Sequence, residues 1–407
     1  MISPGPSVLR IADFVNGYPF KPEQLGHKGL PVVRIRQLVD ATAEFEFANV
    51  PDRPVLLADG DIVLSWSATL AVQRWARGAA LLNQHLFRVD PRPGIDGRWL
   101  TYVLEVGIGR LEPLMHGSAM THITQEMLRS LTVTVPSSEA QSAIADYLDR
   151  ETARIDALIE KKRVVIELLD ARWLSDLCFR LLPADTHSQS PYWARRAKEG
   201  WTLIPLKRLL ARVWAGEWGT EPGTGDVDRL CVRAADFDFS MLESTSGVDR
   251  SFTISSVTGR SLLRGDLIIE KSGGGDGVPV GRVVAWRGSE PAIPTNFAGA
   301  MRPAPMFDAE FVLLVFRAAY EIGLPWRSIK QTTGLQNLDM GHYLAHRWPV
   351  PPIEQQRLVA SHLLEGLQEI RLTQRKLQKE ISLLQEHRQA LITAAVTGEL
   401  EIPGVAA

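Results

Sequence analysis

Cysteine is scarce in this chain of 407 residues. Only Cys178 and Cys231 occur, too few for a disulfide framework or a cysteine-rich zinc site. No stretch of about 18 apolar residues is free of charge, which excludes a typical membrane-spanning helix. The first residues do not combine a basic segment with an apolar run, so we expect no secretory signal peptide. These absences predict a soluble, cytoplasmic protein.

An excess of charge of one sign is also lacking. The chain carries 45 basic and 47 acidic side chains, and the pI is about 6.5. Residues 1–138 hold 13 of each sign, and residues 198–350 hold 17 of each. Any binding of nucleic acid must therefore depend on local patches rather than on a cationic surface.

Catalytic motifs are missing as well. The glycine cluster that starts at Ser272 lacks the Gly-Lys-Ser/Thr ending of a phosphate-binding loop. Glu270 and Lys271 are adjacent, so on a strand they point to opposite faces and do not form a nuclease-type pair. We expect a non-catalytic protein with no catalytic residues, no metal site and no cofactor of its own.

What the sequence does contain is an internal repeat. At an offset of 215 residues, Pro136 pairs with Pro351, Gln141 with Gln356, Leu148 with Leu363, and His122-Ile123 with Asn337-Leu338. Nearer the N-terminus, Gly60-Asp61-Ile62 resembles Gly265-Asp266-Leu267, and Arg34 resembles Arg233. Each half is expected to be a mixed domain of short strands and loops that is followed by a long helix.

The two expected helices carry apolar residues at alternating spacings of four and three. Such a stripe requires a partner helix, and two similar helices in one chain predict an antiparallel coiled coil. The predicted coiled-coil positions are Leu148, Ile155, Leu158, Val165, Leu169, Leu363, Leu367, Ile370, Leu377, Ile381, Leu384 and Leu391. Leu363 to Leu391 would span about 42 Å, somewhat more than the 34–36 Å of one turn of B-DNA.

Both domains contain loops that mix basic, amide, hydroxyl and aromatic side chains. Arg, Gln and Asn make bidentate contacts to base edges, and Lys and Ser suit phosphates. We therefore expect DNA binding at a set of residues spread over both domains. The set consists of Lys21, Arg34, Arg36, Ser65, Trp66, Ser67, Arg74, Gln84, His85, His122, Arg233, Lys271, Ser272, Gly273, Gly274, Arg282, Asn296, Thr333, Gln336 and Asn337.

The sequence resembles the specificity subunit of type I restriction-modification systems over essentially its whole length. Matching stretches lie at 16–21, 31–36, 60–67, 83–85, 233–238, 270–275, 279–282, 331–334, 351–356 and 395–400. The first repeat departs from the family pattern: it has Ser137-Ser138 where a second proline and an apolar residue are usual. Glu151 and Lys162 also interrupt its heptads.

The resemblance implies a bipartite reader of double-stranded DNA. Two target-recognition domains would each bind half of a split site, and a coiled coil would set their spacing. Two adenine methyltransferase subunits and motor-nuclease subunits would be the partners, and S-adenosylmethionine, ATP and Mg would bind to those partners only. The expected segments are recognition domains at 1–136 and 201–350, helices at 137–182 and 351–400, a linker at 183–200 and a tail at 401–407.

Two other functions remain open at this stage. The chain could be a coiled-coil adaptor whose β-rich domains bind protein rather than DNA. It could also be an enzyme with an unfamiliar site, such as a stand-alone nuclease. The DNA sequence that would be read does not follow from these residues.

Overall fold

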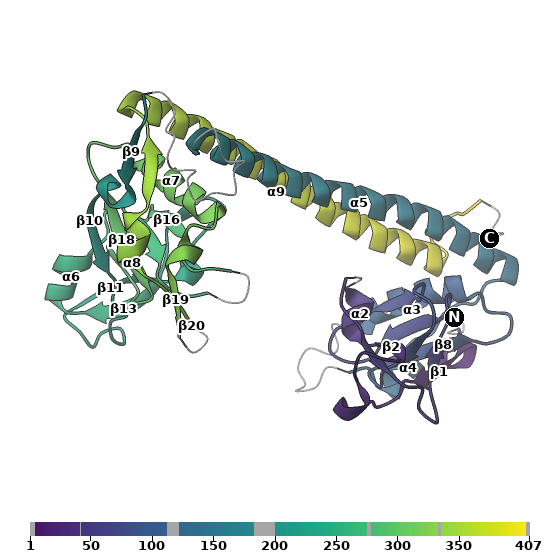
Figure 1. Ribbon diagram of the computed structural model, residues 1–407. Helices are drawn as coiled ribbons and strands as arrows, with labels where there is room; N and C mark the ends of the chain where they lie inside the picture. Colours follow the sequence, from purple (N-terminus) through teal and green to yellow (C-terminus); the bar gives the residue numbers. More distant parts are fainter. Residues whose placement is uncertain are drawn as a thin grey trace. The chain divides into compact units, whose positions relative to one another are not determined.

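The computed structural model describes residues 5–40, 42–111, 122–182, 200–274, 278–332 and 335–403. Two compact units are present: residues 1–162 with 379–407 form unit 1, and residues 163–378 form unit 2. Each unit contains a β-rich domain and part of both long helices, α5 (Ser138–Leu181) and α9 (Ile353–Thr397) (Figure 1). The expected fold class, two mixed domains with two long antiparallel helices, is confirmed.

The domain of unit 1 contains two four-stranded sheets and short helices. One sheet has the order β1 (Ala12–Asn16), β8 (Leu86–Pro91), β5 (Ile62–Ser65), β6 (Val72–Arg74). The other has the order β3 (Glu46–Ala48), β2 (Leu30–Val33), β7 (Ala80–Leu82), β4 (Leu56–Leu57). The helices are α1 (Val8–Ile11), η1 (Pro22–Gln24), α2 (Ile35–Val39), α3 (Gly97–Leu111) and α4 (Gln125–Ser130).

The described residues of the unit 2 domain form four sheets. The largest has the order β10 (Leu210–Ala215), β18 (Ala298–Pro303), β14 (Leu267–Glu270), β16 (Val283–Trp286), β12 (Glu243–Ser244). A second sheet has the order β13 (Val248–Phe252), β11 (Val227–Val232), β17 (Ala292–Pro294). A third has the order β15 (Ser272–Gly273), β20 (Leu335–Leu338), β19 (Ile329–Thr332). The fourth pairs β21 (Arg347–Val350) with β9 (Thr202–Pro205). The helices are η4 (Leu206–Leu209), η5 (Ala234–Asp236), α6 (Ile254–Arg260), α7 (Ala309–Glu321), η6 (Pro325–Ser328) and α8 (Met340–Ala345).

The two domains share one strand topology. In unit 1, β8 lies between β1 and β5, and β2 pairs antiparallel with β3 and parallel with β7. In unit 2, β18 lies between β10 and β14, and β11 pairs antiparallel with β13 and parallel with β17. The internal repeat predicted from the sequence is therefore a repeat of structure.

The repeated Gly-Asp motif forms the same turn in both domains. Gly60 and Gly265 have φ of +99° and +92°, a conformation that favours glycine. The carboxylates of Asp61 and Asp266 then accept hydrogen bonds of 2.8 and 2.7 Å from backbone amides three residues earlier. Each turn leads into the central strand of its sheet, β5 or β14, which explains why these three residues recur.

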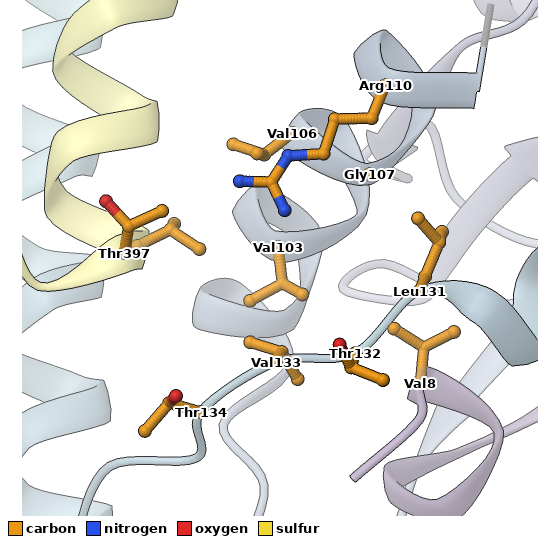
Figure 2. Close-up of a pocket in the computed structure, with 11 residues that line it drawn as sticks. Val8, Val103, Val106, Gly107, Arg110, Leu131, Thr132, Val133, Thr134 and Thr397 are labelled. Carbon is orange, nitrogen blue, oxygen red and sulfur yellow. The ribbon is translucent and has the colours of Figure 1, made fainter. Parts of the chain in front are cut away.

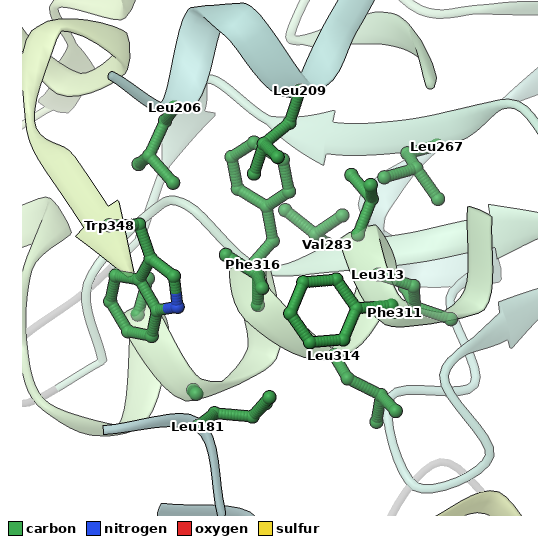
Figure 3. Packing of buried hydrophobic residues seen from close by; sticks show 14 of the residues in the cluster. Leu181, Leu206, Leu209, Leu267, Val283, Phe311, Leu313, Leu314, Phe316 and Trp348 are labelled. Atoms are coloured by element: carbon green, nitrogen blue, oxygen red, sulfur yellow. The ribbon is translucent and has the colours of Figure 1, made fainter. Parts of the chain in front are cut away.

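A nearly all-apolar helix lies at the centre of each domain core. Helix α7 buries Phe311, Leu313, Leu314 and Phe316 against strand residues such as Leu267. Figure 3 shows this packing, in which Leu206 and Leu209 of η4 and Trp348 of β21 complete the cluster. Helix α3 has the same role in unit 1, where it packs with Ile62 and Leu64 of β5. The charged residues of α7, Glu310, Arg317 and Glu321, recur at spacings of seven and four and are half-buried, so they share one side of the helix.

Helices α5 and α9 run antiparallel where they pair inside each unit (Figure 1). In unit 1, Asp156 contacts Arg388 and Lys162 forms an ion pair with Glu380 at 2.5 Å. In unit 2, the Gln374 amide donates to the Ile166 carbonyl at 3.0 Å, and the Trp173 indole donates to the Leu363 carbonyl at 2.9 Å. Residue numbers therefore increase along α5 while those of their partners decrease along α9, as expected for an antiparallel pair.

Burial along α5 corrects the predicted seam. Leu158 and Val165, which the spacing assigned to it, are 48% and 42% exposed, whereas Ile159 is only 6% exposed. The less exposed positions follow the order Leu148, Thr152, Ile155, Ile159, Lys162, Ile166, Leu169, Trp173. From Leu148 the steps are thus four and then three, the reverse of the predicted phase. Leu148, Ile155, Lys162 and Leu169 belong to both phases, and only the positions between them shift by one residue. Leu158 and Val165 are as apolar as Ile159 and Ile166, so residue type does not separate the two phases.

The predicted positions on α9 agree better with the seam. Leu363, Leu367 and Ile381 are buried. The remaining predicted positions are half-buried: Ile370, Leu377, Leu384 and Leu391. The strong 4,3 pattern of this helix made its phase readable from the sequence.

Each long helix begins with the same hydrogen-bonded glutamine. The side chain of buried Gln141 donates to the Pro136 carbonyl at 3.0 Å and accepts from the Asp96 amide at 2.8 Å. Gln356 likewise donates to the Pro351 carbonyl at 2.8 Å and accepts from the Asp308 amide at 2.9 Å. Asp96 and Asp308 immediately precede α3 and α7. The side-chain amide of the glutamine therefore connects the start of each long helix to the start of the central helix of its domain.

Candidate nucleic-acid interface

Three separate chain segments meet at one place in each domain. In unit 1, the Trp66 amide donates to the His85 carbonyl at 3.3 Å, and the Trp66 carbonyl accepts from the Ile123 amide at 2.7 Å. In unit 2, the Lys271 amide donates to the Phe297 carbonyl at 2.8 Å, and its carbonyl accepts from the Leu338 amide at 2.8 Å. We call these places junction 1 (residues 65–67, 83–85 and 122–123) and junction 2 (270–272, 295–297 and 337–338).

Aromatic rings fill junction 1. The Trp66 indole donates to the Gln84 carbonyl at 3.0 Å and to the Asn16 side chain at 3.2 Å. Its ring centroid lies 5.7 Å from that of His85 and 6.4 Å from that of His122. Ser67 hydrogen-bonds to His85 Nδ1 at 3.2 Å. The result is a half-buried cluster of rings with His85 exposed beside it.

Junction 2 presents a cation and amides instead. The aliphatic stem of Lys271 lies over Gly299, where an added Cβ would come 2.9 Å from Lys271 Cδ. Burial lowers the pKa of the Lys271 ammonium, and among the described residues no carboxylate forms an ion pair with it. Ser272 donates to Asn337 Oδ1 at 2.6 Å. Lys271 is therefore available to an anionic ligand such as a phosphate.

The glycines and Gln336 shape the backbone next to junction 2. Gly273 and Gly274 have φ of +129° and +70°. Buried Gln336 accepts a hydrogen bond from the Val280 amide at 3.1 Å, and a Cβ on Gly274 would lie 2.7 Å from its Oε1. Glycine is needed at Gly274 both for its φ and for this close approach. Gln336 thus has a structural role here.

An arginine follows the neighbouring strand in each domain. Arg34 comes after β2 and pairs with Glu46 at 2.9 Å, and Arg233 comes after β11 and pairs with Asp236 at 2.8 Å. Backbone hydrogen bonds from Asn83 to Val33 (3.0 Å) and from Thr295 to Val232 (2.9 Å) hold these strand ends against the junctions. Both guanidinium groups are about two-fifths exposed, so each is presented in a fixed orientation at a similar depth.

A pocket of about 440 Å³ lies beside junction 2. Its lining consists of Trp218, Arg233, Ala234, Ala235, Thr295, Asn296 and Phe297. Phe297 is 50% exposed, and Arg250 stacks on Trp218 with its guanidinium 4.5 Å from the ring centroid. Two accessible aromatic rings and one guanidinium are groups that stack on or contact bases. Trp218 and Phe297 were not predicted from the sequence.

Other predicted residues have internal partners. Arg74 pairs with Asp149 of α5 at 2.5 Å, and Arg282 pairs with buried Glu270 at 2.8 Å. Buried Ser65 donates to the Thr69 carbonyl at 2.6 Å and accepts from the Ala71 amide at 2.7 Å. Each of these three side chains stabilises its own unit through contacts inside it. The structure therefore gives no support to direct DNA contacts by them.

The remaining predicted residues lie nearer the surface. Arg36 donates to the Glu44 carbonyl at 3.0 Å, and the Lys21 side chain is exposed at the start of η1. Gln84 and Asn296 occupy corresponding positions in the junction turns, immediately before His85 and Phe297. Thr333 lies outside the described residues.

A histidine pair in unit 2 was overlooked in the sequence. His342 and His346 are four residues apart on and just after α8, and both lie near one hydroxyl. Ser328 Oγ is 2.8 Å from His342 Nδ1 and 3.4 Å from His346 Nε2. Within the described ranges, no group of three or more His, Cys, Asp or Glu residues is placed to hold a metal ion.

A second pocket of about 220 Å³ lies in unit 1 between α3, residues 131–134 and the end of α9. Figure 2 shows Val103, Val106 and Val133 around it, with the Arg110 guanidinium extending across it. Within residues 131–135 the structure contains only an isolated β-bridge, between Thr132 and Ser7. None of the predicted DNA contacts lines this pocket.

No helix in the described part of the chain combines the length and the apolar character needed to cross a lipid bilayer. This finding concerns the helices alone.

Comparison with known proteins gives one family match and several similar folds. Residues 18–168 match the family model of the type I restriction modification DNA specificity domain. The chain is 20% identical over 167 residues to the type I restriction enzyme EcoBI specificity subunit of Escherichia coli, which covers 40% of this chain and 35% of that subunit. It thus spans about a third of that relative's length.

Two solved structures are similar over nearly the whole chain. A chain from work on complex assembly and conformational transition of the type I R-M system has 15% identity and a TM-score of 0.67, covering 96% of this chain and 98% of that one. The HsdS subunit of Thermoanaerobacter tengcongensis has 16% identity and a TM-score of 0.45, covering 96% and 97%. The first likeness shows a common fold.

Proposed function

We infer that this chain, which carries the DNA specificity domain of the type I restriction-modification family, is the DNA-reading subunit of such a system. Each domain would bind one half of a split target in double-stranded DNA. Junction 1 and the residues around Arg34 would contact one half, and junction 2 with its pocket would contact the other.

The observation that carries this proposal is the duplicated junction. The same three segments meet through the same backbone hydrogen bonds in both domains, and each junction has an arginine beside it. A protein that reads two half-sites needs two such surfaces of one design. Different side chains at corresponding positions would allow an asymmetric target.

We propose that the paired helices α5 and α9 set the spacing between the half-sites and dock two adenine methyltransferase subunits, with motor-nuclease subunits joining that complex. The chain itself would be non-catalytic. S-adenosylmethionine, ATP and Mg would be bound by the partners, and the whole complex would act on DNA in the cytoplasm.

Methylome sequencing tests this proposal. A host without DNA methylation would express the chain with its cognate methyltransferase, and the methyltransferase alone would be the control. We expect a split adenine-methylated motif that disappears without this chain. A stable complex of the two proteins that methylates no motif would contradict sequence-specific reading, and failure to form any complex would favour the adaptor function.

A further inference from the structure

Three pairs of residues occupy corresponding positions at the two junctions. Trp66 corresponds to Lys271, because each donates to the turn before the next strand and accepts from the segment before α4 or α8. His85 corresponds to Phe297, since their carbonyls accept those bonds. His122 corresponds to Asn337, because each pairs with the serine that follows Trp66 or Lys271, as the bridge from Ser67 and the ladder from Ser272 show.

The members of each pair are equally accessible. Trp66 and Lys271 are half-buried, His122 and Asn337 are half-buried, and His85 and Phe297 are exposed. The backbone therefore presents three side chains in the same way in both domains. Only their chemistry differs.

Two neighbouring positions are instead identical in the two domains. Arg34 matches Arg233, and Ser67 matches Ser272. Contacts to the phosphate backbone are common to every DNA sequence, whereas contacts to base edges carry the sequence information. Identical residues at corresponding positions suit the common task, and differing residues suit the specific one.

We propose that Trp66, His85 and His122 in unit 1, and Lys271, Phe297 and Asn337 in unit 2, determine which bases each domain reads. This inference rests on the proposed function. Lys271 and Asn337 can donate hydrogen bonds to purine edges in the major groove, whereas the rings of junction 1 offer apolar contact to a thymine methyl group. Arg34 and Arg233 then position the DNA in both domains.

The test exchanges residues between corresponding positions: His85→Phe, His122→Asn and Phe297→His singly, and Lys271→Trp with Phe297→His and Asn337→His together. Each variant would be expressed with the methyltransferase, and its methylated motif determined. We expect a base preference to change about tenfold or more in one half-site, with the other half-site and the spacing unchanged. His27→Asn, an exposed histidine outside the junctions, is the matched control and should leave the motif unaltered.

The outcomes separate the two proposals. If the wild-type chain directs no split motif, the proposed function fails. If the wild-type motif appears and all three single variants retain both half-sites, the specificity assignment is overturned. Loss of methylation by the triple variant supports the assignment only when that variant melts at the wild-type temperature and still binds the methyltransferase; otherwise the single variants, at exposed or half-buried positions, decide.

Discussion

Residue type alone does not show whether an arginine faces a ligand or a carboxylate of its own domain. Arg74 and Arg282 were expected to contact DNA, yet each is held by a carboxylate inside its own domain. The Glu270 side chain that holds Arg282 is only 5% exposed. A buried carboxylate needs a partner, because an uncompensated charge in the interior is costly.

Arg282→Ala is accordingly expected to lower the free energy of unfolding by about 3 kcal/mol, because it leaves Glu270 buried without its partner. Thermal unfolding would measure the change. Arg357→Ala is the control, since its ion pair with Glu354 is well exposed and should be worth at most about 0.5 kcal/mol. Equal melting temperatures for the two variants would contradict the structural role of Arg282.

Lys271→Ala should weaken DNA binding without unfolding the protein. Loss of its contact to a purine edge is expected to cost about 1–3 kcal/mol of affinity for the cognate half-site and to relax the base preference at that position. Titration of labelled duplex DNA measures the affinity, and Lys376→Ala on the exposed face of α9 is the control. An unchanged affinity would remove Lys271 from the interface.

His346 should make unit 2 sensitive to acid. Burial, together with the nearby His342 and Arg327, lowers the pKa of His346 below 6.5. The unfolded chain then takes up this proton at a higher pH than the folded chain, so stability is retained above pH 6.5 and falls as the pH drops from there towards the lowered pKa. The melting temperature of the wild-type chain should be lower at about pH 5.5 than at pH 7.5. His346→Asn should reduce this difference between the two pH values, whereas His27→Asn should leave it unchanged.

At the scale of elements, the two long helices were predicted well and their phase only in part. The 4,3 spacing of apolar residues on α9 identifies its seam. On α5, the seam residue Thr152 is polar and hydrogen-bonds to the Leu148 carbonyl, and the apolar Leu158 and Val165 lie directly beside the seam residues Ile159 and Ile166. Polar groups that find partners after folding cannot be recognised by their residue type alone.

Adjacent residues on α5 provide a direct test of the seam. Ile159→Asp should destabilise the protein by about 2–4 kcal/mol, because it buries an unpaired charge, and Leu158→Asp should have little effect. Leu377→Asp and Leu372→Asp form the same comparison on α9, where Leu372 is exposed. Thermal unfolding and complex assembly would report both. A larger effect at Leu158 than at Ile159 would restore the original phase.

The central helices α3 and α7 were not predicted at all. Both helices are largely apolar, and a short apolar run does not distinguish a buried helix from a buried strand. In α7 the helical signal was the spacing of Glu310, Arg317 and Glu321 by seven and four residues. Several junction residues were predicted one by one from their type, namely Trp66, His85, His122, Lys271 and Asn337, but their meeting at two junctions was not predicted. That they converge depends on contacts between distant segments, such as Lys271 and Leu338, which are 67 residues apart and which no local pattern connects.

At the scale of the whole molecule, balanced charge limits the electrostatic part of DNA binding. The net charge is −2, and many of the described arginines are paired with carboxylates. We expect modest affinity for the isolated chain, with a slope of log K against log salt that corresponds to fewer than about five phosphates. Fluorescence anisotropy between about 50 and 200 mM salt would measure this slope. A slope near −10 would instead indicate an extensive cationic surface.

The division of the chain into units has a consequence for synthesis. Unit 2 is one continuous stretch, residues 163–378, whereas unit 1 needs residues 379–407 to complete its core. Ile392, Ala395 and Ile402 from that last stretch are buried with Val8 and Leu148. On the ribosome, the domain that is made first must therefore wait for residues 379–407 to emerge, and the domain that is made second can finish folding before it.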